Sequence, residues 1–329
     1  MSSIVVPVWA WVLLGVLVVV SISIDLFLHR GDHVDSRKRA LVWSLVWVGV
    51  SLLFNLGVAI RFGAEAGEQF LAAYLLEKSL SVDNLFVFLL VFGALQIPAA
   101  EQRRVLTWGI FGAIVSRGAL IFAGAAAIER WHGLTYVFGG ILVIAGAKLL
   151  RPPAPEGENG MLRWLERHIP WTRKLDGHHF ITRENGRRVA TPLLLALLAI
   201  ELTDIVFAID SVPAAFAVSQ EPFIIYSSNL LAILGLRALY VVLARALSDL
   251  RYLRFGLSGV LVFAGAKLLT APWIKVSPLL SVGVIAILIT LSVVFSLRAN
   301  RRDARGLARA RLAEAPLSAP PPEQPAGAR

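Results

Sequence analysis

The chain has 329 residues, 57% of them hydrophobic, and a mean hydropathy of +0.71. Soluble domains average about 45–50% apolar residues, so an ordinary soluble protein is excluded. The chain contains no Cys, which excludes disulfides, iron–sulfur clusters and thiolate metal sites, and its six His fall in or beside predicted loops. The net charge of +10 comes from Lys and Arg gathered in loops and in the C-terminal tail. That placement indicates membrane topology, and we expect no nucleic-acid partner.

Runs of about 20 apolar residues predict an all-α polytopic membrane protein with about nine transmembrane helices. The expected spans are residues 4–28, 40–61, 70–94, 105–128, 134–150, 190–214, 222–246, 255–271 and 277–297. With the N-terminus outside and the C-terminus inside, the basic loops all become cytoplasmic. These loops are residues 29–39, 95–104, 151–189 and 247–254.

The spans divide the chain into six parts. They are two N-terminal helices (1–69), a three-helix unit (70–150), a cytoplasmic loop (151–189), a second three-helix unit (190–271), a last helix (272–298) and a disordered cytoplasmic tail (299–329). The loop carries eight Lys or Arg against five Asp or Glu. Residues 161–169 in this loop, M-L-R-W-L-E-R-H-I, suit either a short interfacial helix or a solvated linker.

The two three-helix units resemble each other in sequence. L-V-I-A-G-A-K-L-L at 142–150 recurs as L-V-F-A-G-A-K-L-L at 261–269, and Arg117 has a counterpart in Arg237. Because each unit has an odd number of spans, the second must enter the membrane from the opposite side. Inverted repeats with a polar site between them are a recurrent plan of secondary transporters. Common ancestry with a purely structural core is the alternative.

Charged residues at membrane depth concentrate in the first helix of each unit. The polar residues there are Glu77, Asp83 and Asn84 in the first unit and Glu201, Asp204, Asp210 and Ser211 in the second. A charge at the centre of a membrane costs about 2.5–3.5 kcal/mol on insertion scales and generally has a function. Since the membrane core offers neither His nor Cys, oxygen ligands remain, and these favour Mn²⁺, Mg²⁺ or Ca²⁺ over Cu or Zn.

We therefore expect these seven residues to form a divalent-cation site. Clustered carboxylates in a low dielectric require a metal ion or protons as counter-charge, which gives metal–proton exchange a physical basis. The empty site would be balanced by Arg117, Arg237, Lys148 and Lys267. Pro213 predicts a kink or an unwound turn near Asp210 that would turn Asp210 toward Glu201. The alternative is that these charges form buried ion pairs that join helices.

The motifs E-K-S-L-S-V-D-N-L-F-V-F (77–88) and E-L-T-D-I-V-F-A-I-D-S-V-P-A-A-F (201–216) resemble those of the TerC/Alx family of integral membrane proteins. The resemblance covers about residues 25–297. It implies a multi-pass protein of the bacterial inner membrane that exports a metal, with manganese the expected substrate and tellurium resistance the historical label. It also implies functional roles for the acids at 77, 83, 201, 204 and 210.

The leading hypothesis is a secondary transporter that exports a hard divalent cation, Mn²⁺ first, in exchange for protons. Its partners would be metal ions, protons and the lipid bilayer, without a cofactor. Enzymatic activity is not expected, because the sequence lacks H-E-x-x-H and G-x-x-x-x-G-K-[ST]. The alternative is a non-transporting scaffold or stress-response protein that acts in tellurite resistance or redox and pH responses through cytoplasmic proteins bound at 151–189. The residues alone do not rank Mn²⁺ against Ca²⁺ or Mg²⁺.

Overall fold

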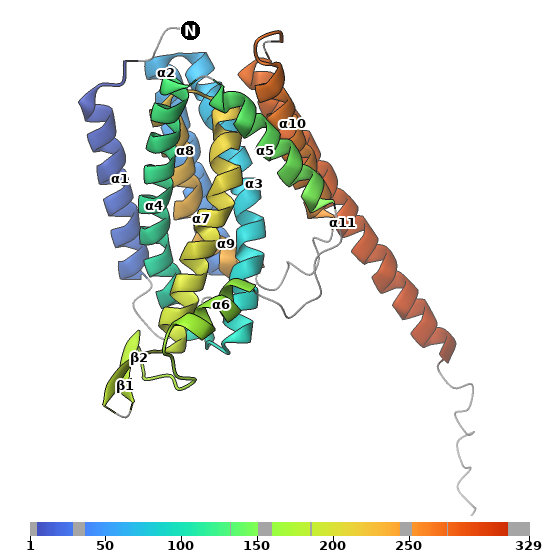
Figure 1. Cartoon of the computed structure of the whole chain (residues 1–329). Helices are drawn as coiled ribbons and strands as arrows, with labels where there is room; N and C mark the ends of the chain where they lie inside the picture. The colour runs from blue at the N-terminus through green and yellow to red at the C-terminus, as the bar shows by residue number, and fades with distance from the viewer. Residues whose placement is uncertain are drawn as a thin grey trace, which may run out of the picture.

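The computed structural model describes residues 5–28, 37–131, 133–150, 160–184, 186–243, 252–274 and 276–314. Within these ranges the helices are α1 (Val8–Leu28), α2 (Arg37–Phe62), α3 (Ala64–Ala94), α4 (Ala99–Arg130), α5 (Leu134–Leu149), α6 (Gly160–His168), α7 (Pro192–Val218), α8 (Pro222–Leu234), α9 (Leu236–Leu243), α10 (Leu253–Thr270) and α11 (Pro278–Glu314). The strands are β1 (Ile181–Glu184) and β2 (Arg187–Ala190). α1, α3, α4 and α7 run roughly side by side, whereas α5, α10 and α11 are inclined to them (Figure 1).

Every predicted span coincides with a helix, although the predicted span 222–246 is divided into α8 and α9 at Gly235. In the part of the chain that the structure describes, five helices are long and apolar enough to cross a membrane, namely Lys38–Phe62, Ala99–Arg130, Pro192–Val218, Leu253–Thr270 and Pro278–Asn300. Shorter apolar helices cover Val8–Ile24, Leu134–Leu149 and Pro222–Leu234. The chain is therefore an all-helical membrane protein with several spans, and the number nine stays a prediction.

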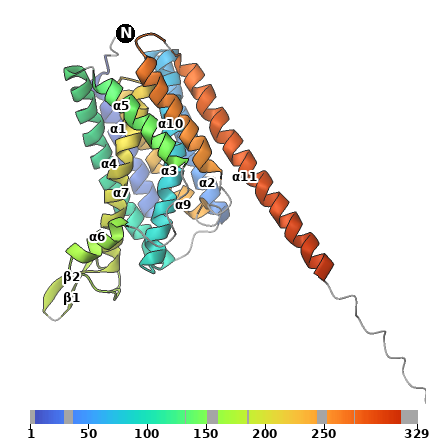
Figure 2. The same cartoon turned by 45° about the vertical axis from the view of Figure 1, so that its right-hand side comes forward.

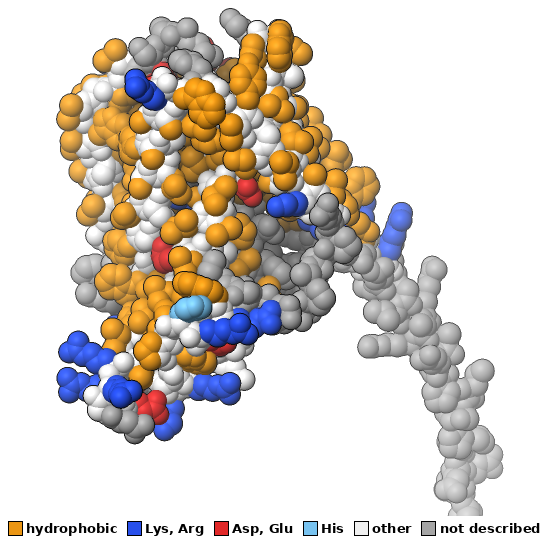
Figure 3. All heavy atoms as spheres, viewed as in Figure 1, with side chains coloured by type: hydrophobic (Ala, Val, Ile, Leu, Met, Phe, Trp, Pro, Cys, Tyr) orange, Lys and Arg blue, Asp and Glu red, His pale blue; other side chains and the backbone are white. Residues whose placement is uncertain are grey.

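The outer surface of the bundle matches a lipid environment. Large apolar side chains are exposed along the helices, including Leu13, Leu45, Leu53, Val115 and Ile287. Figure 3 shows hydrophobic side chains covering the helical part of this face, while Lys and Arg gather at the end that carries the hairpin. This basic end contains the loop that positive-inside topology places in the cytoplasm.

The long internal loop is partly folded. Of the two alternatives for residues 161–169, the short helix is present as α6, and its Leu162 and Leu165 are buried in the core cluster that α7 also lines. β1 and β2 form an antiparallel hairpin, which the sequence analysis did not predict, with Ile181 opposite Ala190. Gly186 adopts φ +77° in the hairpin connection, a left-handed conformation that glycine takes without strain.

The two helices that carry the G-A-K-L-L segments, α5 and α10, pack directly against each other, and the glycine of each segment contacts residues that precede the segment of the other helix. A Cβ on Gly146 would lie 2.9 Å from the Ser258 carbonyl oxygen, and one on Gly265 would lie 2.8 Å from the Gly139 carbonyl oxygen. The same two glycines approach Val262 and Val143 respectively. In the repeat alignment Gly146 corresponds to Gly265, Gly139 to Ser258 and Val143 to Val262. The contacts are therefore reciprocal, as in an interface around a two-fold axis.

Two expectations about helix continuity differ from the structure. α7 remains helical through Pro213, so the unwound turn near Asp210 is absent, whereas a kink at this point stays a prediction. A proline inside a long helix removes one hydrogen bond, and the neighbouring turns keep the rest of the helix intact. The tail predicted as disordered from residue 299 continues as helix α11 to Glu314. Ala, Arg and Leu dominate that segment and are strong helix formers. Residues 315–329 lie outside the described part of the chain.

Candidate charge-paired membrane site

A cluster of charged and amide side chains lies inside the bundle where α3, α4, α7 and α8 meet. Glu77, Arg117, Asp204 and Asn229 contribute one side chain from each helix, and all four are at least 95% buried. Glu77 and Asp204 each lie near the middle of a long helix, about 18–20 Å from its N-terminal end at 1.5 Å per residue. The cluster is thus far from both ends of the bundle.

Arg117 joins the two carboxylates of this cluster. Its Nε and Nη2 donate to the two oxygens of Asp204, at 3.0 and 2.7 Å, and its Nη1 donates to Glu77 Oε1. The planar guanidinium fork matches a carboxylate in this bidentate geometry, which makes it a stronger partner than a lysine. One cation therefore bridges two buried anions from different helices.

Two asparagines fill the remaining hydrogen-bonding positions. Asn229 donates from Nδ2 to Glu77 Oε2 at 2.9 Å and accepts from Arg117 Nη1 at 3.3 Å. When the Asn84 amide is oriented to satisfy both of its ends, its oxygen accepts from Arg117 Nη2 at 3.3 Å and its nitrogen donates to the Leu80 carbonyl oxygen at 3.1 Å. Buried polar groups that are fully bonded in this way hold one geometry.

Lys78 brings a second, partly buried cation beside the cluster. Its Nζ donates 3.0 Å to the carbonyl oxygen of Ala232, near the end of α8, where the helix stops at Gly235. The last carbonyls of a helix lack intrahelical partners, and a cation there also meets the negative end of the helix dipole. Lys78 thus caps the break between α8 and α9 while it lies within electrostatic reach of Glu77.

Glu201 lies one turn away from Asp204 on the same face of α7. Its carboxylate packs against Gly112 so closely that a Cβ on that glycine would overlap it. Gly109 lies one turn earlier on the same face of α4, where a Cβ would lie 3.6 Å from Glu201 Oε1. Among the side chains that the structure describes, none donates a hydrogen bond to the buried Glu201 Oε1. The small residues of α4 therefore leave room for this carboxylate beside the helix.

The other predicted site residues lie apart from the cluster or outside the description. Asp210 faces α5, where it interacts electrostatically with Lys148, and Lys267 donates to Ser281 Oγ on α11 at 2.9 Å. Ser211 is buried, and its hydroxyl has no hydrogen-bond partner among the residues that the structure describes. The side chains of Asp83 and Arg237 lie outside the described part of the chain.

Among the side chains that the structure describes, no three His, Cys, Asp or Glu residues converge as ligands for a metal ion. The structure instead places an arginine between the two carboxylates that come closest to that arrangement, Glu77 and Asp204. The seven residues predicted for the cation site are therefore brought together in part, and their role stays a prediction.

The sequence alone suggests no role for Lys78, and for Asn229 it allows either a place in the wall of the polar cavity or, more simply, a hydrogen bond between helices. A lysine beside a glutamate at membrane depth is a usable signal, because such a residue needs a partner. The partner of Lys78 is a backbone carbonyl oxygen at the α8–α9 break. A sequence motif made of side chains does not predict a backbone partner. Asn229 sits on the predicted span 222–246 that aligns with the Arg117 helix, and this alignment was the available clue.

The fold and this interior charge cluster define a polytopic helical membrane protein with a polar site enclosed by apolar helices. Residues 62–304 match the Integral membrane protein TerC family, and the chain belongs to that family. It is 49% identical over 297 residues to the uncharacterized membrane protein STKORF319 of Myxococcus xanthus, with 89% of this chain and 92% of the relative covered.

Two further relatives extend the comparison. The chain is 43% identical over 305 residues to Alx of Salmonella typhi, a proposed membrane-bound redox modulator, with 89% of this chain and 95% of the relative covered. It is 39% identical over 273 residues to the chloroplast thylakoid membrane protein TERC of Arabidopsis thaliana, with 82% and 71% covered. No solved structure matches the chain.

Proposed function

We propose that this protein is a secondary transporter of the bacterial inner membrane that exports a hard divalent cation, Mn²⁺ first, in exchange for protons. The observation that carries the proposal is the pair of buried carboxylates, Glu77 and Asp204, that meet at Arg117 in the middle of the bundle. Oxygen ligands of this kind suit Mn²⁺, Mg²⁺ and Ca²⁺. On this proposal the protein is a carrier and not an enzyme.

We further propose that the two three-helix units are inverted repeats within a nine-span, N-out, C-in topology. The reciprocal packing of α5 and α10 supports this arrangement, because equivalent residues exchange places across the contact. In the alignment that sets Asp83 against Asp210, Glu77 falls opposite Asp204. Arg117 therefore binds the equivalent acid of each three-helix unit. Transporters built from inverted repeats bind their substrates at the interface between the repeats, near the middle of the membrane.

Arg117 acts as an internal counter-cation in this proposal. A buried carboxylate pair without a positive partner is strongly unfavourable, so either the guanidinium, a metal ion or protons must balance Glu77 and Asp204. The structure supports the arginine-balanced state as the resting state. Binding of a divalent cation would release Arg117 from Asp204, and protonation of the acids on the other side would release the cation.

Glu201 offers a step on the route to this pair. It lies on α7 between the basic end of the bundle and Asp204, about 4–5 Å along the helix axis from Asp204. Its unpaired oxygen and its position beside Gly109 and Gly112 fit a weak ligand that passes a cation inward. Conduction through several moderate sites requires such intermediate ligands.

Flux in proteoliposomes tests the proposal directly. The full-length chain is reconstituted with an internal pH dye and offered Mn²⁺, Ca²⁺ or Mg²⁺ in separate runs. We expect metal flux with opposed proton movement in the unmodified protein and at least a tenfold loss in Asp204→Asn, which keeps the shape of the side chain but removes its charge. Glu184→Gln, on the exposed hairpin, is the matched control for the loss of one acid.

Flux without any proton movement would limit the proposal to metal transport alone. No flux with any of the three ions, from protein that inserts and folds normally, would overturn it.

A second candidate function rests on the folded cytoplasmic module of α6, β1 and β2, which projects from the bundle at its basic end (Figures 1 and 2). Such a module suits a soluble protein partner, and Alx of Salmonella typhi carries the redox description. Since this chain has no Cys, a redox role would have to act through that partner and not through thiols of its own. Replacement of the hairpin residues 181–188 by a flexible linker leaves the buried leucines of α6 in place, so it should spare flux in a transporter and abolish the effect of a scaffold.

A further inference from the structure

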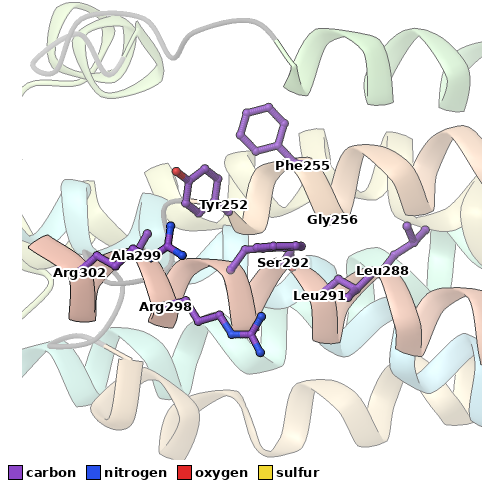
Figure 4. Close-up of a pocket in the computed structure, with 10 residues that line it drawn as sticks. Tyr252, Phe255, Gly256, Leu288, Leu291, Ser292, Arg298, Ala299 and Arg302 are labelled. Carbon is purple, nitrogen blue, oxygen red and sulfur yellow. The ribbon is translucent and has the colours of Figure 1, made fainter.

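A groove of about 690 Å³ runs along the contact between α10 and the middle part of α11, and none of the charge-cluster residues lines it. Figure 4 shows the residues that line the groove. Tyr252 immediately precedes α10, Phe255 and Gly256 lie in its first turn, and the other lining residues belong to α11. The α11 residues are Leu288, Leu291, Ser292, Phe295, Arg298, Ala299 and Arg302. They recur every three or four positions, so they form one continuous stripe along a single face of the helix.

The groove is apolar along most of its length and cationic at one end. Phe255, Leu291 and Phe295 are 42%, 48% and 55% exposed, so the apolar part opens outward and does not join the protein core. Arg298 and Arg302 follow on the same stripe, and none of the described residues that line the groove is acidic. An occupant therefore needs a long apolar part and an anionic end.

The depth of these groups matches the layers of a bilayer. Pro278–Asn300 is the most hydrophobic candidate span, so Arg298 and Arg302 stand where that apolar segment ends. Leu288 and Phe295 precede Arg298 by ten and three residues, which places them roughly 5–15 Å deeper along the helix. The arginines thus fall at headgroup level and the apolar residues at acyl-chain level.

The way in which the two helices meet keeps the groove formed. A Cβ on Gly256 would lie only 2.6 Å from Ser292 Oγ, and the Tyr252 backbone N–H donates to Ser296 Oγ at 3.0 Å. These two contacts fix α11 against the start of α10. Beyond them α11 leaves the bundle, as both views show (Figures 1 and 2). The groove is therefore built by a fixed helix crossing, and it stands open toward lipid.

We propose that this groove binds one anionic phospholipid, with its phosphate at Arg298 and Arg302 and an acyl chain along Leu288, Leu291 and Phe295. Basic pockets between transmembrane helices on the cytoplasmic side of a membrane bind anionic headgroups in this way. A zwitterionic phospholipid would fill the same apolar stripe but would gain less from the two arginines. The site is independent of cation transport, and its occupant would hold α11 to α10.

Native mass spectrometry of the delipidated full-length protein tests the site. The protein in detergent is offered equal amounts of phosphatidylglycerol and phosphatidylethanolamine with identical acyl chains. We expect one retained phosphatidylglycerol in preference to phosphatidylethanolamine. Since each arginine near a headgroup contributes about fivefold, Arg298→Gln with Arg302→Gln should reduce phosphatidylglycerol affinity about 25-fold.

The control is the double variant Arg187→Gln with Arg188→Gln, which removes the same charge from the exposed hairpin and should leave lipid retention unchanged. A further variant, Leu291→Trp, fills the apolar part without a change in charge and should reduce the retention of both lipids. If the hairpin control loses as much phosphatidylglycerol binding as the groove variant does, the lipid responds only to the net charge of the protein, and the proposal is overturned. Unchanged phosphatidylglycerol binding in either groove variant would also overturn it.

Discussion

Arg117 and Asp204 form a two-pronged ion pair across the α4–α7 contact, with hydrogen bonds of 3.0 and 2.7 Å and both side chains almost fully buried. An ion pair at such depth gains its stability from complete hydrogen bonding, and the loss of one partner leaves an uncompensated charge. The pair also shares its arginine with Glu77. The balance of charge at this point therefore governs both the stability of the bundle and the binding of any cation there.

The first prediction concerns Arg117→Gln. Removal of the guanidinium leaves Glu77 and Asp204 without their cation, which should cost about 3–5 kcal/mol of stability in metal-free buffer. A divalent cation that binds the freed acids would recover part of this loss by mass action. We therefore expect Mn²⁺ to raise the thermal unfolding midpoint of the variant more than that of the unmodified protein, measured in detergent by tryptophan fluorescence.

Arg117→Lys serves as the partner variant for this measurement. A lysine keeps the charge but lacks the fork, so it should give an intermediate loss of stability and an intermediate response to Mn²⁺. If Mn²⁺ stabilises all three proteins equally, the arginine and the metal do not compete for the same acids.

The second prediction separates two acids of α7. Asp204 belongs to the central cluster, whereas Asp210 faces Lys148 on α5. In the flux assay Asp210→Asn should retain much more activity than Asp204→Asn, and Lys148→Gln should resemble Asp210→Asn, because both remove one side of the same interaction. Equal loss of flux in Asp204→Asn and Asp210→Asn would show that the distant acid takes part in transport.

A third prediction tests the close fit of Glu201 against α4. Gly112→Ala adds a Cβ where the Glu201 carboxylate lies, so the acid must move or the helices must separate. Overpacking of this kind typically costs about 1–3 kcal/mol. We expect lower stability and slower flux. Gly140→Ala on α5 is the control, since a Cβ there meets nothing within 4 Å, and it should be neutral or stabilising. Indistinguishable behaviour of the two variants would remove the packing argument.

The fourth prediction concerns Lys78→Met. Methionine keeps the length of the side chain but leaves the Ala232 carbonyl without its donor at the α8–α9 break. An unsatisfied buried acceptor costs about 1–3 kcal/mol, and hydrogen exchange should show faster opening of residues 230–236. Lys174→Met on an exposed loop removes the same charge and should leave both measurements unchanged. Unaltered exchange in Lys78→Met would mean that the break holds without its lysine.

The sequence was sufficient to predict the apolar helices, because a segment that crosses a membrane needs about 20 apolar residues and this constraint is local. It was also sufficient to identify the acids of both three-helix units, since charges in such segments are exceptional. These features depend on residues near one another in the chain. The spacing of Leu, Trp and Arg at 161–169 allowed a short helix but left a solvated linker equally open, and the tertiary structure decided for the helix.

The partners of those charges were decided by the tertiary structure alone. Glu77 and Asp204 lie 127 positions apart and come together because Arg117 reaches both from a third helix. Helical periodicity shows which face of a helix a residue occupies, but it does not show which neighbouring helix packs against that face. We expected Asp210 to turn toward Glu201, but Asp210 lies toward Lys148 on α5. The continuity of α7 through Pro213 was likewise decided by packing, because the surrounding helices hold the chain helical where proline alone would favour a break.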